Sequence, residues 1–284
     1  MVDEKENILK KQVDFRRDTK TLCIDLEIAP RVAYLYGWYE TSVLEEIRPP
    51  ILLAVGWKWL GEKHAHCLSL YDRKTVDPYN DKLLVNELWN LLDEANIVCA
   101  FNGNKFDIKQ ANTFFVRHNM TPPSPYKQVD PLVAAKRWFS FGCNKLDHLG
   151  KLLVNEGKTE VTYKDCWKDL LEGNEKEKKQ ASKLMNTYCA RDVEVLEKVY
   201  LKVLPWMNNH PNMALYAGQP DICPRCGQQS EFKVKSYRRT GMQINAIQYQ
   251  CSKCGAYVTR KLDKEEREQL KEEGKLTSVF RNMV

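Results

Sequence analysis

The chain has 284 residues, of which 43% are hydrophobic and 29% are charged, and its formal net charge is +6. This balance is typical of a folded globular protein and excludes a wholly disordered chain, and the length accommodates one sizeable domain and one small one. No apolar run approaches the ~20 residues that a membrane helix requires, and residues 1–17 are highly charged without an apolar centre. We therefore expect a cytoplasmic protein.

The first 120 residues predict strands, followed by an alternation of strands and helices. Short apolar and β-branched runs predict strands, whereas leucines at helical spacing after Asp81, a plausible cap, predict a helix. The predicted strands are Thr21–Glu27, Val32–Tyr36, Ile51–Leu60, Ala65–Tyr71 and Ile97–Phe101, and the predicted helices are Asp81–Ala95 and Phe106–Asn119. This order is typical of a mixed α/β sheet flanked by helices.

The remainder of the chain predicts helices and then a small second domain. The predicted helices are Pro131–Phe139, Leu146–Leu153, one or two within Asn174–Leu204, and a charged helix over Asp263–Lys275. Three prolines and a glycine indicate a linker between the two domains. The predicted organisation is an N-terminal extension over 1–19, an α/β domain over 20–204, a linker over 205–220, a small domain over 221–262, and a charged helix and tail over 263–284.

Three short stretches carry acids that could form a metal site. Asp25 and Glu27 alternate with apolar residues in the first predicted strand, so both point to one face. Asp107 follows a strand and a glycine turn, and Tyr188 and Asp192 share one face of a late helix. Each stretch also has an ordinary structural interpretation. The acids of the strand could lie at its solvated end, Asp107 could cap a helix, and Tyr188 and Asp192 could be a common helical pair. Together, four converging carboxylates would repel one another without metal, and would bind two Mg²⁺ or Mn²⁺ ions.

The order and spacing of these residues resemble the motifs of the DEDD superfamily of 3′–5′ exonucleases, the proofreading-type, DnaQ-like nucleases with a ribonuclease H-like fold. The first motif, acid-x-Glu, is matched by Asp25 and Glu27, and the second, Asn-x-x-x-Phe-Asp, by residues 102, 106 and 107. The third motif has a tyrosine form (DEDDy), matched by Tyr188 and Asp192, and a histidine form, which Thr187 excludes. The resemblance covers about residues 20–204.

This resemblance implies a ribonuclease H-like mixed sheet and hydrolysis of phosphodiester bonds with two metal ions. Asp25 would bridge the two ions, Glu27 and Asp192 would help hold the ion that binds the attacking water, and Asp107 would hold the second. Tyr188 would orient the water through its hydroxyl, because an ordinary phenol stays protonated near neutral pH. One ion would stabilise the attacking oxygen and the other the leaving 3′ oxygen, so the product would be a nucleoside 5′-monophosphate.

The same resemblance implies contacts with the substrate strand. Ile28 and Ala29 would line a pocket for the terminal base, and Asn102 and Phe106 would help to position the strand. We predict single-stranded 3′ ends as the substrate, with DNA favoured over RNA because proofreading relatives act on DNA, and a polymerase or another replication or repair protein as a possible partner. Two alternatives stay open: an RNA-processing exoribonuclease, and a nucleic-acid-binding or assembly factor that acts mainly through the small domain.

The ten cysteines fall into two groups. Six occur singly, mostly among apolar neighbours, and are interpreted as reduced, buried thiols: Cys23, Cys67, Cys99, Cys143, Cys166 and Cys189. The other four form two Cys-x-x-Cys-Gly knuckles: Cys223, Cys226, Cys251 and Cys254. Four thiolates suit one tetrahedral, structural Zn²⁺ ion, and alternating residues between the knuckles predict a β-hairpin, so the segment resembles a zinc ribbon. A redox dithiol pair and a rubredoxin-type iron site are the alternatives.

The formal charge excess lies in this cysteine-rich segment. Residues 221–262 contain eight lysines or arginines against two acids, and the segment stays basic after four thiolates and one Zn²⁺ are counted. We expect a surface that binds a polyanion. Lys233, Lys235, Arg238 and Arg239 would contact phosphates, with Tyr237 among them to stack on bases. Protein docking is the alternative role for this segment.

Overall fold

The structure is a computed structural model that describes residues 19–37, 39, 42–73, 77, 79–157, 167–217, 221–240 and 243–273, with the side chains of 217, 239, 240, 243 and 244 left out. The N-terminal extension up to residue 18, Cys166 and the tail after residue 273 lie outside these ranges. The chain divides into two compact units, with the boundary between Val203 and Leu204. Within the described residues, no helix is both long enough and apolar enough to cross a membrane.

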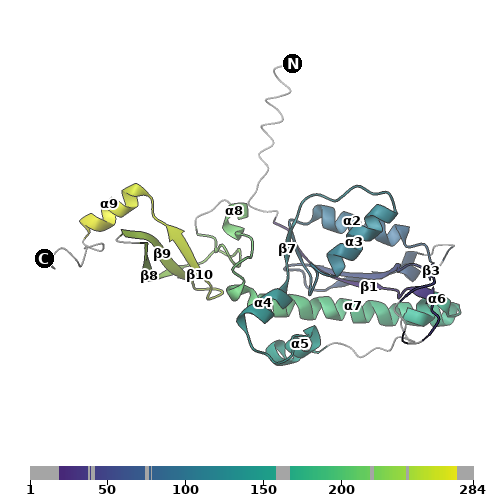
Figure 1. Ribbon diagram of the computed structural model, residues 1–284. Coiled ribbons are helices and arrows are strands. Elements are labelled where there is room, and N and C mark those ends of the chain that lie inside the picture. Colours follow the sequence, from purple (N-terminus) through teal and green to yellow (C-terminus); the bar gives the residue numbers. More distant parts are fainter. Residues whose placement is uncertain are drawn as a thin grey trace, which may run out of the picture. The chain divides into compact units, whose positions relative to one another are not determined.

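The first unit is built on a five-stranded mixed sheet, in agreement with the predicted α/β class (Figure 1). Its strands are β1 (Thr21–Ile28), β4 (Leu52–Trp59), β5 (His66–Ser69), β6 (Ile97–Cys99) and β7 (Lys127–Val129), in the order β5-β4-β1-β6-β7. The central strand β1 runs antiparallel to β4 and parallel to β6. Its apolar side chains Leu22, Ile24 and Leu26 are buried in a core that they share with residues of the helices that follow β5 and β6.

Helices cover both faces of this sheet (Figure 1). On one face lie α2 (Lys82–Glu94) and α3 (Asp107–Arg117). On the other lies α7 (Glu175–Val203), which contacts β1, β4 and β5 and packs against α4 (Pro131–Trp138), α5 (Leu146–Val154) and α6 (Asp169–Glu172). The long helix α7, which carries Tyr188 and Asp192, therefore lies across one face of the sheet and contacts β1 there.

Several predicted elements differ in detail from the structure. The run at 32–36 forms β2 (Val32–Tyr34), which pairs with β3 (Glu45–Arg48) in a separate two-stranded sheet. The strand predicted over Ala65–Tyr71 ends at Ser69 and continues as the 3-10 helix η1 (Leu70–Arg73), because Asp72 Oδ2 accepts hydrogen bonds from the backbone N–H and the hydroxyl of Ser69. The short elements β3, β7 and α6 were not predicted.

Asp81 has a different role from the helix cap that the sequence suggested. Its side chain accepts no capping hydrogen bond from α2. One carboxylate oxygen instead accepts the N–H of Leu52 at 2.9 Å, and the other lies 2.6 Å from His118 Nε2. The buried carboxylate thus connects β4 to the residue that ends α3.

The second unit contains a three-stranded antiparallel sheet in the order β10-β9-β8. Its strands are β8 (Phe232–Thr240), β9 (Gln243–Cys251) and β10 (Tyr257–Lys261). The predicted hairpin is present as β8 and β9, and β10 is an addition. Residues 205–217, predicted as linker, include the end of η3 (Leu204–Trp206) and α8 (Met213–Ala217). The charged helix is α9 (Lys264–Glu272), which begins with a capping box formed by Asp263 and Glu266.

Candidate active site and cysteine centre

Two acids of the central strand share one face of the main sheet. Asp25 and Glu27 are both partly buried and alternate with the buried Ile24 and Leu26. Their carboxylate oxygens lie within 4.8 Å of each other and of the Cys189 thiol. The strand therefore presents two closely spaced negative charges toward α7.

Asp107, the first residue of α3, contacts the same strand. The parallel pairing of β1 with β6 stops at Cys23 and Cys99, so the N–H of Leu26 lies beyond that ladder. Asp107 Oδ1 accepts a hydrogen bond from this N–H at 3.2 Å, and the Asp107 side chain is 3% exposed. A third acid is thereby fixed at the backbone position between Asp25 and Glu27.

The third part of the cluster comes from α7, where Tyr188 and Asp192 are one turn apart. Asp192 is completely buried, and Tyr188 is partly buried, with its ring 6.3 Å from that of Trp167 in an edge-on contact. Burial raises the pKa of Tyr188, as do the charges of Asp192, Glu27 and Asp25 and a hydrogen bond to Asp192. Tyr188 is therefore a protonated hydrogen-bond donor at neutral pH and lies close to these three acids.

A glycine makes room for the helix above these acids. Gly56 of β4 pairs with Asp25 on one side and with Cys67 of β5 on the other. A Cβ at Gly56 would lie 2.6 Å from Cys189 Sγ, and this thiol lies 3.6 Å from the carbonyl oxygen of Asp25. A hydrogen bond with Cys67 raises the pKa of Cys189, as do burial and the charges of Asp25 and Glu27, so the thiol is neutral.

Sequence reasoning missed the roles of Cys189 and Gly56. Gly56 did carry a usable signal, because an isolated glycine inside an apolar strand often marks the close approach of another element. Cys189 gave no signal beyond its position next to Tyr188.

The donor set of this cluster fits hard divalent cations. Several carboxylates held near one another in a partly buried site are costly without positive charge, and Mg²⁺ and Mn²⁺ prefer oxygen ligands. The carboxylates of Asp25 and Glu27 lie close together. Asp107 accepts the N–H of Leu26, the residue between them. Asp192 is hydrogen-bonded to Tyr188, which is near both strand acids. The residues present are therefore suited to metal-dependent chemistry.

The four residues expected to contact substrate occupy different environments. Phe106 is 44% exposed, and Ile28 is partly buried. Ala29 is 1% exposed, so its side chain lies in the core. Asn102 adopts the left-handed conformation (φ 63°) and donates its backbone N–H to Asp130 Oδ1 at 3.0 Å. Asn102 thus shapes the turn that leads to Asp107.

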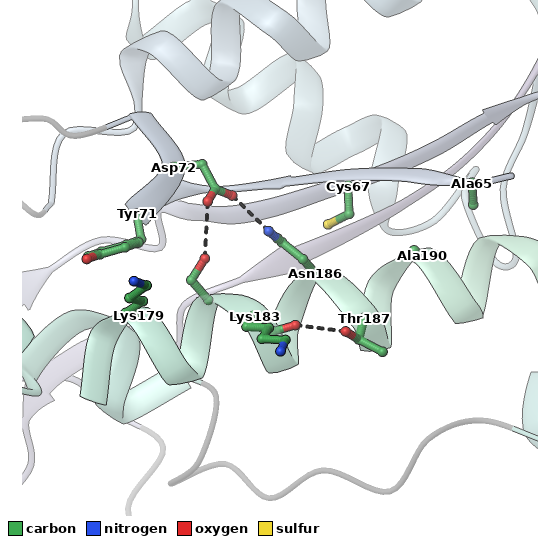
Figure 2. A pocket seen from close by; sticks show the side chains of 10 residues that line it. Ala65, Cys67, Tyr71, Asp72, Lys179, Lys183, Asn186, Thr187 and Ala190 are labelled. Carbon is green, nitrogen blue, oxygen red and sulfur yellow. Dashed lines mark hydrogen bonds between the residues drawn. The ribbon is translucent and has the colours of Figure 1, made fainter. Parts of the chain in front are cut away.

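A hollow of about 510 Å³ lies on another side of α7, against β5 and η1 (Figure 2). Asp72 lies within it and accepts hydrogen bonds from Asn186 Nδ2 at 2.9 Å and Ser182 Oγ at 3.3 Å. Asn186 and Tyr188 are two positions apart, so they point about 160° apart, to nearly opposite sides of the helix. The hollow is therefore distinct from the carboxylate cluster, although Cys67 lines it.

The four paired cysteines of the second unit also come together. The thiols of Cys223, Cys226, Cys251 and Cys254 all lie within 4.8 Å of one another, so they could hold a zinc ion. Both knuckles have the same backbone geometry. Gly227 N–H donates to the Cys223 carbonyl at 2.9 Å and Gly255 N–H to that of Cys251 at 3.0 Å, with glycine φ angles of 69° and 76° that favour this residue.

The expected nucleic-acid contacts of this unit lie in β8. Lys233, Lys235 and Arg238 are exposed, and the side chain of Arg239 lies outside the described residues. Tyr237 is 37% exposed.

Comparison with known proteins identifies the family of the first unit. A family model of the RNase H superfamily matches residues 51–204, which is more than half of the chain and includes Asp107, Tyr188 and Asp192. No protein with a curated description matches the sequence. A family B DNA polymerase from the hyperthermophilic archaeon Pyrobaculum calidifontis is similar in structure, with 9% sequence identity and a TM-score of 0.47. That match covers 81% of this chain and 34% of the polymerase, so the chain spans about a third of that protein.

The predicted ribonuclease H-like α/β fold is thus confirmed, together with a small C-terminal β-sheet that carries a cysteine cluster. The chain belongs to the RNase H superfamily.

Proposed function

We propose that this protein is a metal-dependent 3′–5′ exonuclease that releases nucleoside 5′-monophosphates from single-stranded DNA. The observation that carries the proposal is the cluster of acids on and around β1. Asp25 and Glu27 lie side by side, Asp107 binds the N–H between them, and Tyr188 lies close to Asp192 and both strand acids. The matches of these residues to the tyrosine subgroup of the DEDD exonucleases support the 3′–5′ polarity.

Asp25, Glu27, Asp107 and Asp192 would hold two Mg²⁺ or Mn²⁺ ions. When bound, such ions neutralise the acids, activate water and stabilise the leaving 3′ oxygen. Tyr188 would act as a hydrogen-bond donor that orients the attacking water, because a phenol of ordinary pKa stays protonated near pH 7. Phe106, exposed beside Asp107, would position the terminal nucleotides together with Asn102 and Ile28.

The second unit would act as a zinc ribbon that assists binding of the substrate. Four thiolates leave no open position on a tetrahedral ion, so the zinc would be structural. Cys226→Ser should release the ion, measured by metal analysis of the purified protein, and should lower affinity for the strand. Retention of one equivalent of zinc by this variant would contradict the assignment.

The decisive test is digestion of DNA and RNA oligonucleotides, labelled at either end, single- or double-stranded, with Mg²⁺ or Mn²⁺. A 5′-labelled strand should shorten one nucleotide at a time, and a 3′-labelled strand should release the label as a mononucleotide at once. Asp107→Asn and Asp192→Asn should each abolish release, because each loses a charge while keeping an oxygen acceptor of the same shape. Full activity of either variant would reject the site, and preference for RNA would move the proposal to an exoribonuclease.

A further inference from the structure

The sheet of the second unit has two faces, and pairing across its strands places the basic residues on one of them. Lys233 of β8 and Tyr257 of β10 both lie opposite Gln250 of β9. Arg238 and Lys261 both lie opposite Ala246, four positions before Gln250 in β9 and therefore on the same face. A register shift between residues 234 and 236 resets the alternation of β8, so that Arg238 returns to the face of Lys233. We call the face that carries Lys233, Arg238, Tyr257 and Lys261 the basic face.

Side-chain contacts agree with this assignment. On the basic face, Arg238 Nη2 and Ser236 Oγ donate to Gln248 Oε1 at 2.7 and 3.2 Å. On the other face, the rings of Phe232 and Tyr249 meet edge-on at 6.4 Å. Both rings, with Val258 and with Asn212 and Ala214 near α8, line a hollow of about 440 Å³. The apolar face is thus associated with a segment of the same unit.

This geometry changes which tyrosine accompanies the basic residues. The sequence suggested Tyr237, but Tyr237 lies opposite Ile247, two residues from Tyr249, and so belongs to the apolar face. Tyr257 is on the basic face and is 52% exposed. The aromatic ring on the same face as Lys233 therefore comes from β10, with Gln250 of β9 between the two residues.

The charges of the two faces also differ. Lys233, Arg238 and Lys261 are exposed, and no carboxylate among the described residues lies within ion-pair distance of them. On the apolar face, by contrast, Arg260 forms an ion pair with Glu266 at 2.6 Å. Positive side chains around an exposed tyrosine complement a strand with charged phosphates and bases that can stack.

We propose that the basic face binds single-stranded nucleic acid, with Tyr257 stacking on a base and Lys233, Arg238 and Lys261 contacting phosphates. The choice of polymer rests on the proposed nuclease function, whereas the surface and its residues rest on the geometry of the sheet. This surface would hold a strand independently of the chemistry at β1.

The two tyrosines provide a matched test on the full chain. Affinity for fluorescently labelled single-stranded DNA and RNA is measured by anisotropy without added Mg²⁺ or Mn²⁺, so that the strand stays intact. Tyr257→Ala should weaken binding about tenfold, the scale of one lost base stack, whereas Tyr237→Ala should leave affinity unchanged. Thermal unfolding and zinc content establish that both variants fold. Equal affinities, or equal losses, in the two variants would overturn the proposal.

A pair of double variants tests the charges. Lys233→Ala/Lys261→Ala should reduce the slope of log affinity against log salt by about 1.4, since each phosphate contact on a single strand contributes about 0.7. Lys264→Ala/Lys271→Ala removes two exposed lysines from α9 and should leave the slope unchanged. Identical slopes for both double variants would also reject the proposal that the basic face binds nucleic acid. That result is the one expected if the face binds a protein instead.

The outcomes separate this proposal from the proposed function. If the variants bind as the wild type does and mononucleotides are still released with Mg²⁺, the basic face is wrong and the exonuclease stands. If Tyr257→Ala weakens binding but no mononucleotide is ever released, the basic face stands and the exonuclease is wrong.

Discussion

Cys189 lies directly above Gly56, so that a single added methyl group at residue 56 would come within 2.6 Å of the Cys189 sulfur and 3.0 Å of its carbonyl oxygen. The backbone oxygen cannot move without moving α7. Because α7 also carries Tyr188 and Asp192, the contact sets how closely these side chains approach β1.

Gly56→Ala should therefore destabilise the protein by about 1–3 kcal/mol, the usual cost of overpacking a core, and should lower nuclease activity more than stability alone explains. Urea unfolding and initial rates of mononucleotide release measure the two effects. Gly37→Ala is the control, because no atom lies within 4 Å of a Cβ at that position. Wild-type stability and rate in Gly56→Ala would show that α7 tolerates the shift.

Asp107 should show separate structural and chemical roles. Asp107→Asn keeps an oxygen that can accept the N–H of Leu26, so its stability should match that of the wild type. Asp107→Ala leaves this buried N–H without its acceptor and should cost about 1–3 kcal/mol. Both variants should lose activity, and urea unfolding should distinguish them. Equal stabilities of the two variants would mean that the hydrogen bond contributes little.

Much of the fold was predictable, because the relevant signals are local. The apolar run of β1, the helical spacing of α2 and the two cysteine knuckles each depend on a few neighbouring residues. The elements that were missed, such as β3, β7, α6, α8 and β10, have only three to five residues each, and the strands among them pair with residues elsewhere in the chain. Short runs carry too little periodicity to reveal such partners.

The candidate site shows the same division. The acids could be chosen from motif order, but their connections could not. Asp81 has the sequence context of a helix cap, yet its carboxylate binds Leu52 and His118, which are 29 and 37 residues away. Likewise, the sequence alone placed Tyr237 beside the basic residues because it could not show the register shift in β8.

Lys58 of β4 and Glu197 of α7 form an ion pair in the core, with each residue 6% exposed. Removing one partner should leave an unpaired buried charge, so Lys58→Met or Glu197→Leu alone should cost about 3–5 kcal/mol. The double variant should recover most of this loss, because two apolar side chains of similar size can pack together. A double-mutant cycle of unfolding free energies measures the coupling, and additive losses would contradict it.

His210 makes the stability of the second unit depend on pH. Its imidazole is 8% exposed and its Nδ1 lies 2.8 Å from the carbonyl oxygen of Pro211. Burial lowers the pKa of His210 from 6.5 to about 4, and the charge of Arg225 adds to this shift against the opposing effect of the hydrogen bond.

The unfolded chain consequently binds a proton on His210 before the folded chain does. The stabilisation is present above pH 6.5 and should decline as pH falls toward 4, by about 2 kcal/mol at pH 5. Unfolding free energies at pH 7 and pH 5 should fall more steeply for the wild type than for His210→Gln, which does not titrate. Parallel pH profiles would show that His210 titrates normally in the fold.

Asp130 holds the turn before Asp107 in place, and this has a consequence for the evolution of the chain. One of its oxygens, Oδ1, accepts the N–H of Asn102 at 3.0 Å and that of Leu132 at the start of α4 at 2.9 Å. Asp130, which is not one of the clustered acids, thus anchors the loop that leads to Asp107. Among homologues, positions 102, 107 and 130 should therefore be inherited as a set, and a lineage that discards the chemistry should be free to lose all three together.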